Sequence, residues 1–245
     1  MINIIKFSTI DSTNSYAKNH IYELKDRDVI TADSQEKGRG RFSRTWISRN
    51  PDNLYCTIVL KPSEIPRDYP IATVSHYLAY VIADYIDRYL LVSRITTTIK
   101  WPNDVRIKGK KIAGILPESV IQGDVLKGIV LGFGINLNMS LHELDAIDQP
   151  ATSLNHWIGS DIDKNEFFNG LLDEFFKNYE EFVNKGFEII RKLYTIKADF
   201  LGQVISIKTV DSIVQGCASE IDSNGNLILK LTDGSFKTMT IGEIV

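Results

Sequence analysis

IAGIL, residues 112–116, and KGIVLGFGI, residues 127–135, are two apolar segments rich in β-branched residues. Segments of this length and composition are predicted to be β-strands. Gly114 lies inside the first segment, where a glycine lets a ligand come close to the strand backbone. Four further segments with the same character are expected to be strands. They are residues 3–7, 29–32, 54–60 and 95–100.

Helical patterns lie between and after these strands. Apolar residues recur at every third and fourth position from 71 to 89, which predicts a helix with one face against a sheet. Asp163 and Glu166 form a capping-box pattern, which starts a second helix whose apolar face runs on to Phe182. Gly186 is placed to end that helix, and another helical stretch is expected over residues 187–198.

The chain changes character from Gly202 onward, where short strands alternate with turns. The segment 222–225, Asp-Ser-Asn-Gly, predicts a hairpin because Asn-Gly tolerates the positive φ angles that such turns require. About 45 residues with four or five strands predict a small β-barrel that docks on a larger domain. The expected fold class is therefore α+β, with a central mixed β-sheet flanked by helices in residues 1–198 and a small β-barrel in residues 199–245.

The composition is that of a globular protein that can bury a large core, with 245 residues of which 43% are hydrophobic and 24% charged. No uncharged stretch reaches the ~17 to 25 residues that a transmembrane helix needs. The N-terminus lacks a signal-peptide pattern, so a cytoplasmic location is expected. The two cysteines and four histidines show no metal-ligand spacing, and any metal is expected to be an oxygen-liganded ion that is weakly held.

Positive charge is concentrated in one segment. The net charge of −3 gives the whole molecule no reason to bind nucleic acid or a membrane, but residues 37–49 carry five cations and no acid. Within them, Gly38-Arg39-Gly40-Arg41 combines a flexible backbone with guanidinium groups that suit phosphate or carboxylate. Taken alone, this repeat is better explained as a flexible basic surface loop, or as one that contacts nucleic acid.

Three other polar segments are candidates for ligand binding. Lys111 follows the segment Lys100-Trp101-Pro102-Asn103-Asp104 and suits a reacting carboxylate or phosphate, whereas Asp104 suits Mg²⁺. Asp11-Ser12-Thr13-Asn14 can cap a helix, bind a neutral polar ligand such as a urea, or do both. Asn136 has the amide geometry to pair with an adenine edge. Taken singly, each is explained at least as well by a turn, a helix cap or a strand end.

Together and in this order, the motifs resemble those of the biotin protein ligases. The resemblance runs from about residue 7 to residue 154 and rests on the following segments: Asp11-Ser12-Thr13-Asn14, Gly38-Arg39-Gly40-Arg41 with Trp46, Lys100-Trp101-Pro102-Asn103-Asp104, Lys111 with Gly114-Ile115-Leu116, Gly134-Ile135-Asn136, and Ala151-Thr152-Ser153-Leu154. The tail that ends Gly242-Glu243-Ile244-Val245 is similar to the small SH3-like domain of that family. The resemblance implies a class II synthetase-like catalytic domain in residues 1–198 and an SH3-like domain in residues 199–245.

The resemblance also implies a two-step reaction. Biotin and MgATP form biotinyl-5′-adenylate and pyrophosphate, and a lysine of a biotin carboxyl carrier protein then takes the biotin and releases AMP. Residue roles are implied by motif position: Ser12, Thr13, Asn14, Gln35, Gly38, Arg39, Lys111 and Gly114 bind biotin; Arg41, Trp46, Asn103 and Asn136 bind ATP or the adenylate; and Asp104 binds Mg²⁺. Lys111, Arg39 and Arg41 are the expected catalytic residues.

Two differences from the family pattern bear on these expectations. Ser43 stands where the pattern Gly-Arg-Gly-Arg-x-Gly-Arg-x-Trp has its third glycine. Only 11 residues precede Ser12, whereas many family members carry a winged-helix domain there, so a ligase without repressor function or a nucleic-acid partner is expected. The edges of the central sheet make a homodimer plausible.

Alternatives from other classes remain. A lipoate or octanoate protein ligase shares the catalytic architecture, but the chain has no Gly-Gly-Gly-x-x-x-His-type segment. A non-catalytic biotin-binding or nucleotide-binding protein is less favoured because Lys111, Asp104 and Arg39 are all present. An RNA-binding protein is less favoured because the chain is acidic overall and no aromatic residues alternate with its cations.

Overall fold

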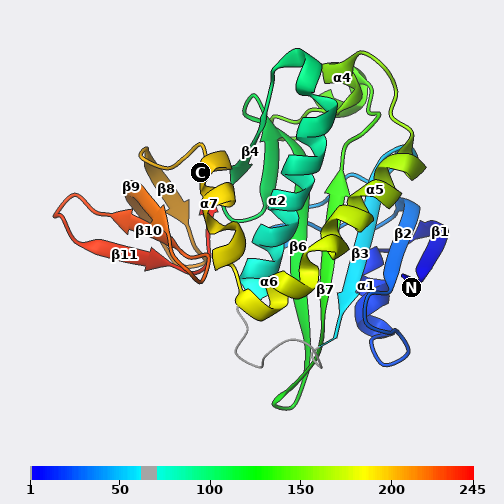
Figure 1. The fold of residues 1–245 in the computed structure, drawn as a ribbon, viewed down its shortest axis with the longest axis horizontal. Helices are drawn as coiled ribbons and strands as arrows, with labels where there is room; N and C mark the ends of the chain where they lie inside the picture. Colours follow the sequence, from blue (N-terminus) through cyan, green and yellow to red (C-terminus); the bar gives the residue numbers. More distant parts are fainter. Residues whose placement is uncertain (1, 62–70) are drawn as a thin grey trace.

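The computed structural model describes residues 2–61 and 71–245, and its framework is two β-sheets with helices packed against the larger one (Figure 1). The larger sheet has seven strands in the order β1-β2-β3-β7-β6-β5-β4. Their bounds are Ile4–Ile10 (β1), Val29–Gln35 (β2), Leu54–Leu60 (β3), Thr97–Lys100 (β4), Asp104–Ile107 (β5), Lys110–Gln122 (β6) and Val125–Ile135 (β7). β1 and β2 are parallel and the other neighbours antiparallel, which confirms the mixed sheet.

The six strands expected from the sequence all form, with shifted ends. The two apolar segments 112–116 and 127–135 become parts of β6 and β7, which pair in a register that sets Gly114 opposite Gly134. β5 was not predicted because its four residues include Asp104 and Arg106, and two polar positions in so short a segment hide a strand. The consequence is that the Lys100–Asp104 segment forms the turn between β4 and β5, beside β6.

The helices expected over residues 71–89, 163–186 and 187–198 form, and the short helices Leu141–Asp145 and Asn155–Ile158 were not predicted. Their bounds are Thr13–Asn19 (α1), Ile71–Tyr89 (α2), Leu141–Asp145 (α3), Asn155–Ile158 (α4), Lys164–Lys177 (α5), Tyr179–Lys185 (α6) and Glu188–Lys197 (α7), with 3-10 turns at Arg41–Ser43 and Leu91–Ser93. The Asp163 carboxylate accepts from the amides of Asn165 at 2.8 Å and Glu166 at 3.0 Å, as the capping pattern predicts. The single helix expected from Asp163 to Gly186 is divided at Asn178, whose φ of −115° interrupts α5 and α6.

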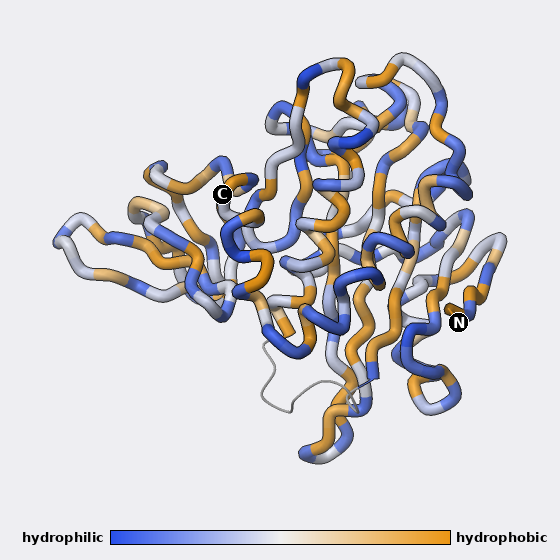
Figure 2. The backbone as a smooth tube through the Cα atoms, in the orientation of Figure 1, coloured by the Kyte–Doolittle hydropathy of each residue, from blue (hydrophilic) through white to orange (hydrophobic). Residues whose placement is uncertain are grey.

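The main core lies between the large sheet and α2. Leu78 and Ile82 of α2 are fully buried and belong to one apolar cluster with Ile58 of β3 and Leu131 of β7. Figure 2 shows hydrophobic residues concentrated along the central strands. Each such side chain contributes about 1.5–3 kcal/mol on burial, so the strands that carry the glycines and polar residues of the site rest on a rigid base.

The C-terminal residues form a five-stranded antiparallel sheet in the order β11-β10-β9-β8-β12. The bounds are Val204–Lys208 (β8), Ile213–Ile221 (β9), Leu227–Lys230 (β10), Phe236–Met239 (β11) and Glu243–Ile244 (β12). In the described part of the chain no ladder joins β11 to β12, so the closed barrel is corrected to an open sheet. β12 has only two residues, which is too short to close it. The boundary at residue 199 stays a prediction.

The two sheets are linked by a hairpin turn. The carbonyl of Gly225, in the predicted Asn-Gly turn between β9 and β10, accepts from Trp101 Nε1 at 3.0 Å and lies 2.9 Å from His76 Nε2. His76 belongs to α2, and Trp101 belongs to the turn before β5. Figure 1 shows the small sheet beside β4 and α7, on the side of the large sheet that carries this turn. In the described residues, no helix is long and apolar enough to span a membrane.

Candidate active site

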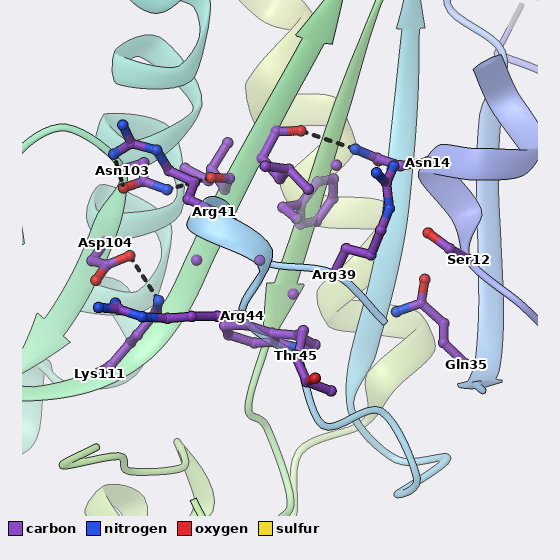
Figure 3. A pocket seen from close by; sticks show the side chains of 18 of the residues that line it. Ser12, Asn14, Gln35, Arg39, Arg41, Arg44, Thr45, Asn103, Asp104 and Lys111 are labelled. Atoms are coloured by element: carbon purple, nitrogen blue, oxygen red, sulfur yellow. Dashed lines mark hydrogen bonds and ion pairs between the residues drawn. The ribbon is translucent and has the colours of Figure 1, made fainter. Parts of the chain in front are cut away.

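A pocket collects most of the residues singled out by the sequence. It is lined by the start of α1, the basic loop that follows β2, the turn before β5 and the backbones of β6 and β7. The predicted residues among its lining are Ser12, Thr13, Asn14, Gln35, Arg39, Arg41, Trp46, Asn103, Asp104, Lys111 and Gly114. Figure 3 shows Ser12 and Gln35 at one end of the pocket and Arg41, Asn103, Asp104 and Lys111 at the other.

The first end of the pocket is neutral and polar. Ser12 caps α1, because its hydroxyl accepts from the amide of Ser15 at 3.4 Å. Both the amide and the hydroxyl of Thr13 donate to Gln35 Oε1, at 2.9 and 3.2 Å, and Gln35 Nε2 donates to Ser48 Oγ at 2.9 Å. The helix cap is therefore confirmed, and the same residues line the pocket, so binding of a neutral polar ligand stays a prediction.

Asn14 is held in place by the protein. Its Oδ1 accepts from Thr57 Oγ1 at 2.6 Å, and its Nδ2 donates to the Leu116 carbonyl at 3.0 Å and to Glu118 Oε2 at 2.9 Å. A Cβ added to Gly132 would lie 2.0 Å from Asn14 Oδ1, so the glycine makes room for this amide. Asn14 lines the pocket, yet its amide is already used to join α1 to β3 and β6.

The basic loop folds back on itself. The amide of Gly40 donates to the Arg44 carbonyl at 2.7 Å, and the amide of Trp46 donates to the Gly38 carbonyl at 3.0 Å. A Cβ on Gly38 would lie 2.3 Å from the Trp46 carbonyl oxygen, so Gly38 supports the loop and is not part of the pocket lining. Ser43 has a φ of +60°, the left-handed conformation that glycine adopts most easily. Ser43 thus takes, with some strain, the backbone expected of the missing glycine.

The Trp46 indole lies over the strand backbones. A Cβ on Gly114 would come within 2.8 Å of the indole, and one on Gly134 within 2.3 Å, so these paired glycines create the space that the ring occupies. The indole Nε1 is buried and has no hydrogen-bond partner in the described residues. Lys111 Nζ lies 5.3 Å from the ring centroid. The indole N–H is therefore enclosed against the strand backbones, and the Trp46 ring lies beside the Lys111 ammonium in the pocket lining.

The cationic end is balanced by acids and amides of the protein. Lys111 Nζ pairs with Asp104 Oδ1 at 2.8 Å, Arg39 Nη2 with Glu118 Oε2 at 2.6 Å, and Arg41 Nη1 donates to Asn103 Oδ1 at 3.2 Å. Burial lowers the pKa of Arg41 from its ordinary value, although the Asp104 carboxylate acts in the opposite direction. All three cations thus line the pocket while each is held by a partner from the protein.

Two acidic residues that pair with arginines of the pocket lining were not predicted from the sequence. Glu118 pairs with Arg39, and Glu243 of β12 pairs with Arg44 at 2.5 Å. Strand alternation carried a signal for Glu118, because Gly114, Leu116 and Glu118 are two residues apart and share one face of β6. No pattern in the sequence predicts that Glu243, near the end of the chain, contacts the basic loop.

Asn136 lies in an adjoining pocket. That pocket shares Arg44, Trp46 and Lys111 with the first one and adds Lys100 and Asn136. The Asn136 side chain is 4% exposed, and its Nδ2 donates to the Thr152 carbonyl at 3.0 Å. Asn136 thus lines the second pocket, which adjoins the cationic end of the first, and its contact with adenine stays a prediction.

Asp104 is the single metal-ligand candidate that the sequence proposed. Its carboxylate is already paired with Lys111, and the described residues contain no group of three His, Cys, Asp or Glu side chains that could hold a metal ion. One carboxylate suits Mg²⁺, which usually keeps several waters and binds one or two carboxylates together with substrate phosphates. The residues therefore fit an ion that arrives with a phosphate ligand and do not form a complete metal site.

Comparison with known proteins supports a common family. The pattern of the biotin/lipoate A/B protein ligase family matches residues 7–136. The chain is 31% identical over 207 residues to the bifunctional ligase/repressor BirA of Bacillus subtilis, covering 84% of this chain and 62% of that protein. It is also 31% identical over 223 residues to the biotin–[acetyl-CoA-carboxylase] ligase of Paracoccus denitrificans, covering 90% of this chain and 91% of the relative.

A solved structure shares the whole fold. The biotin protein ligase from Aquifex aeolicus in complex with biotin and ATP superposes with a TM-score of 0.82 at 26% identity, covering 100% of this chain and 98% of that one. The chain thus matches the Paracoccus ligase over about nine tenths of both lengths, whereas it spans about three fifths of the length of the Bacillus protein. From the match over residues 7–136 and the identity to curated relatives, the chain belongs to the biotin/lipoate A/B protein ligase family.

Proposed function

We propose that this protein is a biotin protein ligase. It activates biotin with MgATP to biotinyl-5′-adenylate and transfers the biotin to a lysine of a biotin carboxyl carrier protein. The observation that carries the proposal is the pocket itself, which has hydroxyl and amide groups at Ser12, Thr13 and Gln35 and cations at Arg39, Arg41 and Lys111. A ligand with a neutral urea-like head and a carboxylate tail matches these two ends.

The first half-reaction depends on bringing two anions together. The biotin carboxylate oxygen attacks the α-phosphorus of ATP and pyrophosphate leaves, so negative charges must approach each other. Fixed cations at that junction lower the barrier because they need no reorganisation as charge develops. Lys111, Arg39 and Arg41 would neutralise this charge. Trp46 and Asn103 would contact the nucleotide, and Asn136 would do so from the adjoining pocket.

In the second half-reaction the carrier lysine attacks the carbonyl carbon of the mixed anhydride and AMP leaves. The intermediate is prone to hydrolysis, so exclusion of water matters until the carrier arrives. The Trp46 ring of the basic loop lies against Gly114 of β6 and Gly134 of β7, which supports a role of this loop in excluding water. Asp104 would hold the Mg²⁺, which neutralises phosphate charge when it is bound.

The alternatives within the superfamily differ in the acid that they use. The names of the Paracoccus and Aquifex relatives both specify biotin, which favours biotin over lipoate or octanoate. The edge strands β1 and β4 of the large sheet are compatible with the homodimer expected from the sequence. Sedimentation velocity with and without biotin and MgATP measures that assembly directly.

The decisive experiment combines the protein with biotin, MgATP and a biotin carboxyl carrier domain. The expected result is the mass increase of one biotinyl group on a single carrier lysine, together with release of pyrophosphate and AMP. Lipoate in place of biotin serves as the specificity control. Pyrophosphate release with lipoate but not with biotin would replace the proposed substrate, and no release with either acid would overturn the enzymatic assignment.

A further inference from the structure

Glu118 has contacts that neither the sequence motifs nor the proposed chemistry explain. It lies on β6, four residues after Gly114, and its side chain is 19% exposed. Three groups from two other parts of the chain reach its carboxylate. They are Asn14 Nδ2 at 2.9 Å, Lys18 Nζ at 2.8 Å and Arg39 Nη2 at 2.6 Å. The carboxylate thus joins α1, β6 and the basic loop at one point.

The charge of Glu118 is stabilised in place. Burial opposes its ionisation, but hydrogen bonds from Lys18 and Asn14 and the charge of Arg39 together bring its pKa below the ordinary value. One carboxylate faces two cations, so the cluster retains a positive charge. The contact with Glu118 uses Nη2, and a guanidinium has five N–H donors, so Arg39 keeps donors for an anionic ligand.

The same cluster joins the neutral end of the pocket to Arg39, the first arginine of the basic loop. Asn14 follows Ser12 and Thr13 of the neutral end and is fixed by Thr57 and the Leu116 carbonyl. Glu118 Oε2 accepts from both Asn14 and Arg39, so a single oxygen lies between the neutral end and the first cation of the loop. Arg39 is a long side chain that is 40% exposed, and without such a partner it would sample many rotamers.

We infer that Glu118 is a positioning residue for Arg39, which sets the guanidinium at the distance from the Ser12–Thr13 end that the ligand carboxylate requires. The inference rests on the proposed function, because it takes the carboxylate of biotin as the anion. Its distinctive consequence is selectivity. Loss of Glu118 weakens binding of ligands that carry the carboxylate and leaves neutral ligands with the same head unaffected.

Isothermal titration calorimetry with Glu118→Gln tests this inference. The ligands are biotin and biotinol, the neutral alcohol of the same length. Gln removes the charge while preserving size, so biotin should bind about tenfold more weakly and biotinol within about twofold of wild type. Glu174→Gln is the matched control. Glu174 of α5 pairs with Arg88 of α2 at 2.9 Å, its side chain is 25% exposed, and neither residue lines the pocket. This control should bind both ligands as wild type does.

Two further variants separate positioning from a simple structural link between α1 and β6. Lys18→Met removes another partner of the same carboxylate but keeps the Arg39 pair, so biotin affinity should stay within about twofold of wild type. In an Arg39→Met background, Glu118→Gln should cause no additional loss of biotin affinity, because both changes act on one interaction. Glu118→Asp, which keeps the charge but shortens the reach, gives a smaller loss in the same direction and serves if Glu118→Gln does not fold.

Distinct results would overturn the inference. Equal weakening of biotin and biotinol would assign Glu118 a structural role, and tighter biotin binding would make it a competitor of the ligand for Arg39. Unchanged biotin binding in a folded Glu118→Gln or Glu118→Asp protein would also refute positioning. A wild-type protein that binds neither biotin nor biotinol would refute the proposed function instead, so the two failures are distinguishable.

Discussion

At the scale of single residues, cations of the site form ion pairs with carboxylates of the protein, Lys111 with Asp104 and Arg39 with Glu118. Lys111 and Asp104 are 16% and 12% exposed at their side chains, so their ion pair lies largely out of water. Truncating one member of such a pair leaves the other charge buried and unpaired, which destabilises a protein more than the pair itself contributes. Loss of activity and loss of stability must therefore be separated at this position.

Lys111→Ala should lower the rate of adenylate formation by about 10²- to 10³-fold, because one fixed charge at the reacting centre is lost. The double variant Lys111→Ala/Asp104→Asn should recover much of the thermal stability while remaining inactive. Pyrophosphate release and thermal unfolding measure the two effects. Lys110→Ala is the control, since this neighbour is exposed and outside the pocket lining. Substantial turnover by Lys111→Ala would remove the catalytic role of Lys111.

At the scale of secondary-structure elements, the pairing of β6 with β7 forms the surface on which the Trp46 ring packs. Gly114 and Gly134 face each other across this ladder, and both would clash with the indole if they carried a side chain. The position of the loop thus depends on two glycines from strands that are far from it in sequence.

Gly134→Ala should displace the Trp46 indole, because the added Cβ would lie 2.3 Å from Cε2 of the ring. The expected result is faster loss of the adenylate to solvent, while the overall fold is kept. Biotinylation of bystander lysines reports the release, and tryptophan fluorescence reports the displacement of the ring. Wild-type retention of the adenylate by Gly134→Ala would show that the position of the Trp46 indole does not control release of the adenylate.

The α2 helix carries a buried histidine at its contact with the C-terminal hairpin. Burial lowers the pKa of His76 from 6.5 to about 4, although its hydrogen bond with the Gly225 carbonyl acts in the opposite direction. Between these two pH values the unfolded chain binds a proton that the folded chain does not. Stability should therefore fall as the pH decreases from about 6.5 to about 4.

His76→Gln should remove this part of the pH dependence, which amounts to about 1.4 kcal/mol per pH unit for one proton. Gln retains an N–H donor that can face the Gly225 carbonyl. Urea unfolding of both proteins across the pH range measures the difference in slope. His142→Gln, at an exposed position of α3, serves as the control for the substitution itself. Identical slopes for wild type and His76→Gln would contradict the neutral, buried state.

At the scale of the whole molecule, the two sheets share one continuous apolar cluster. Ile207 and Leu229 of the small sheet belong to the same cluster as Leu78 of α2 and Phe187 before α7. The Gly225 carbonyl adds hydrogen bonds at this junction, and Glu243 of β12 reaches Arg44 of the basic loop. Docking of the small sheet therefore bears on the shape of the site.

Gly225→Ala should loosen this docking. Its Cβ would lie 2.9 Å from His76 Cδ2, in addition to the strain of a φ of +77°. Gly234→Ala is a close control, because Gly234 has a φ of +84° in another hairpin with nothing within 4 Å. Gly225→Ala should be cleaved faster by protease between α7 and β8 and should turn over more slowly. Gly234→Ala should lose only the stability that a side chain at a positive φ costs, with wild-type cleavage between α7 and β8 and wild-type turnover. Equal behaviour of the two variants would argue against a specific docking contact.

The sequence by itself determined the longer strands and helices and most of the lining of the site, but not the short helices α3 and α4. Apolar alternation, helical periodicity, the Asp163 cap and the Asn-Gly turn are local signals, and they identified the β-strands with the exception of β5 and the two-residue β12. Motif order then supplied the family and the candidate residues. Only the tertiary structure decided that the small sheet is open and that Arg39 meets Glu118 while Arg44 meets Glu243. These partners are 79 and 199 residues apart, and local patterns specify which face a side chain takes but not which distant side chain it meets.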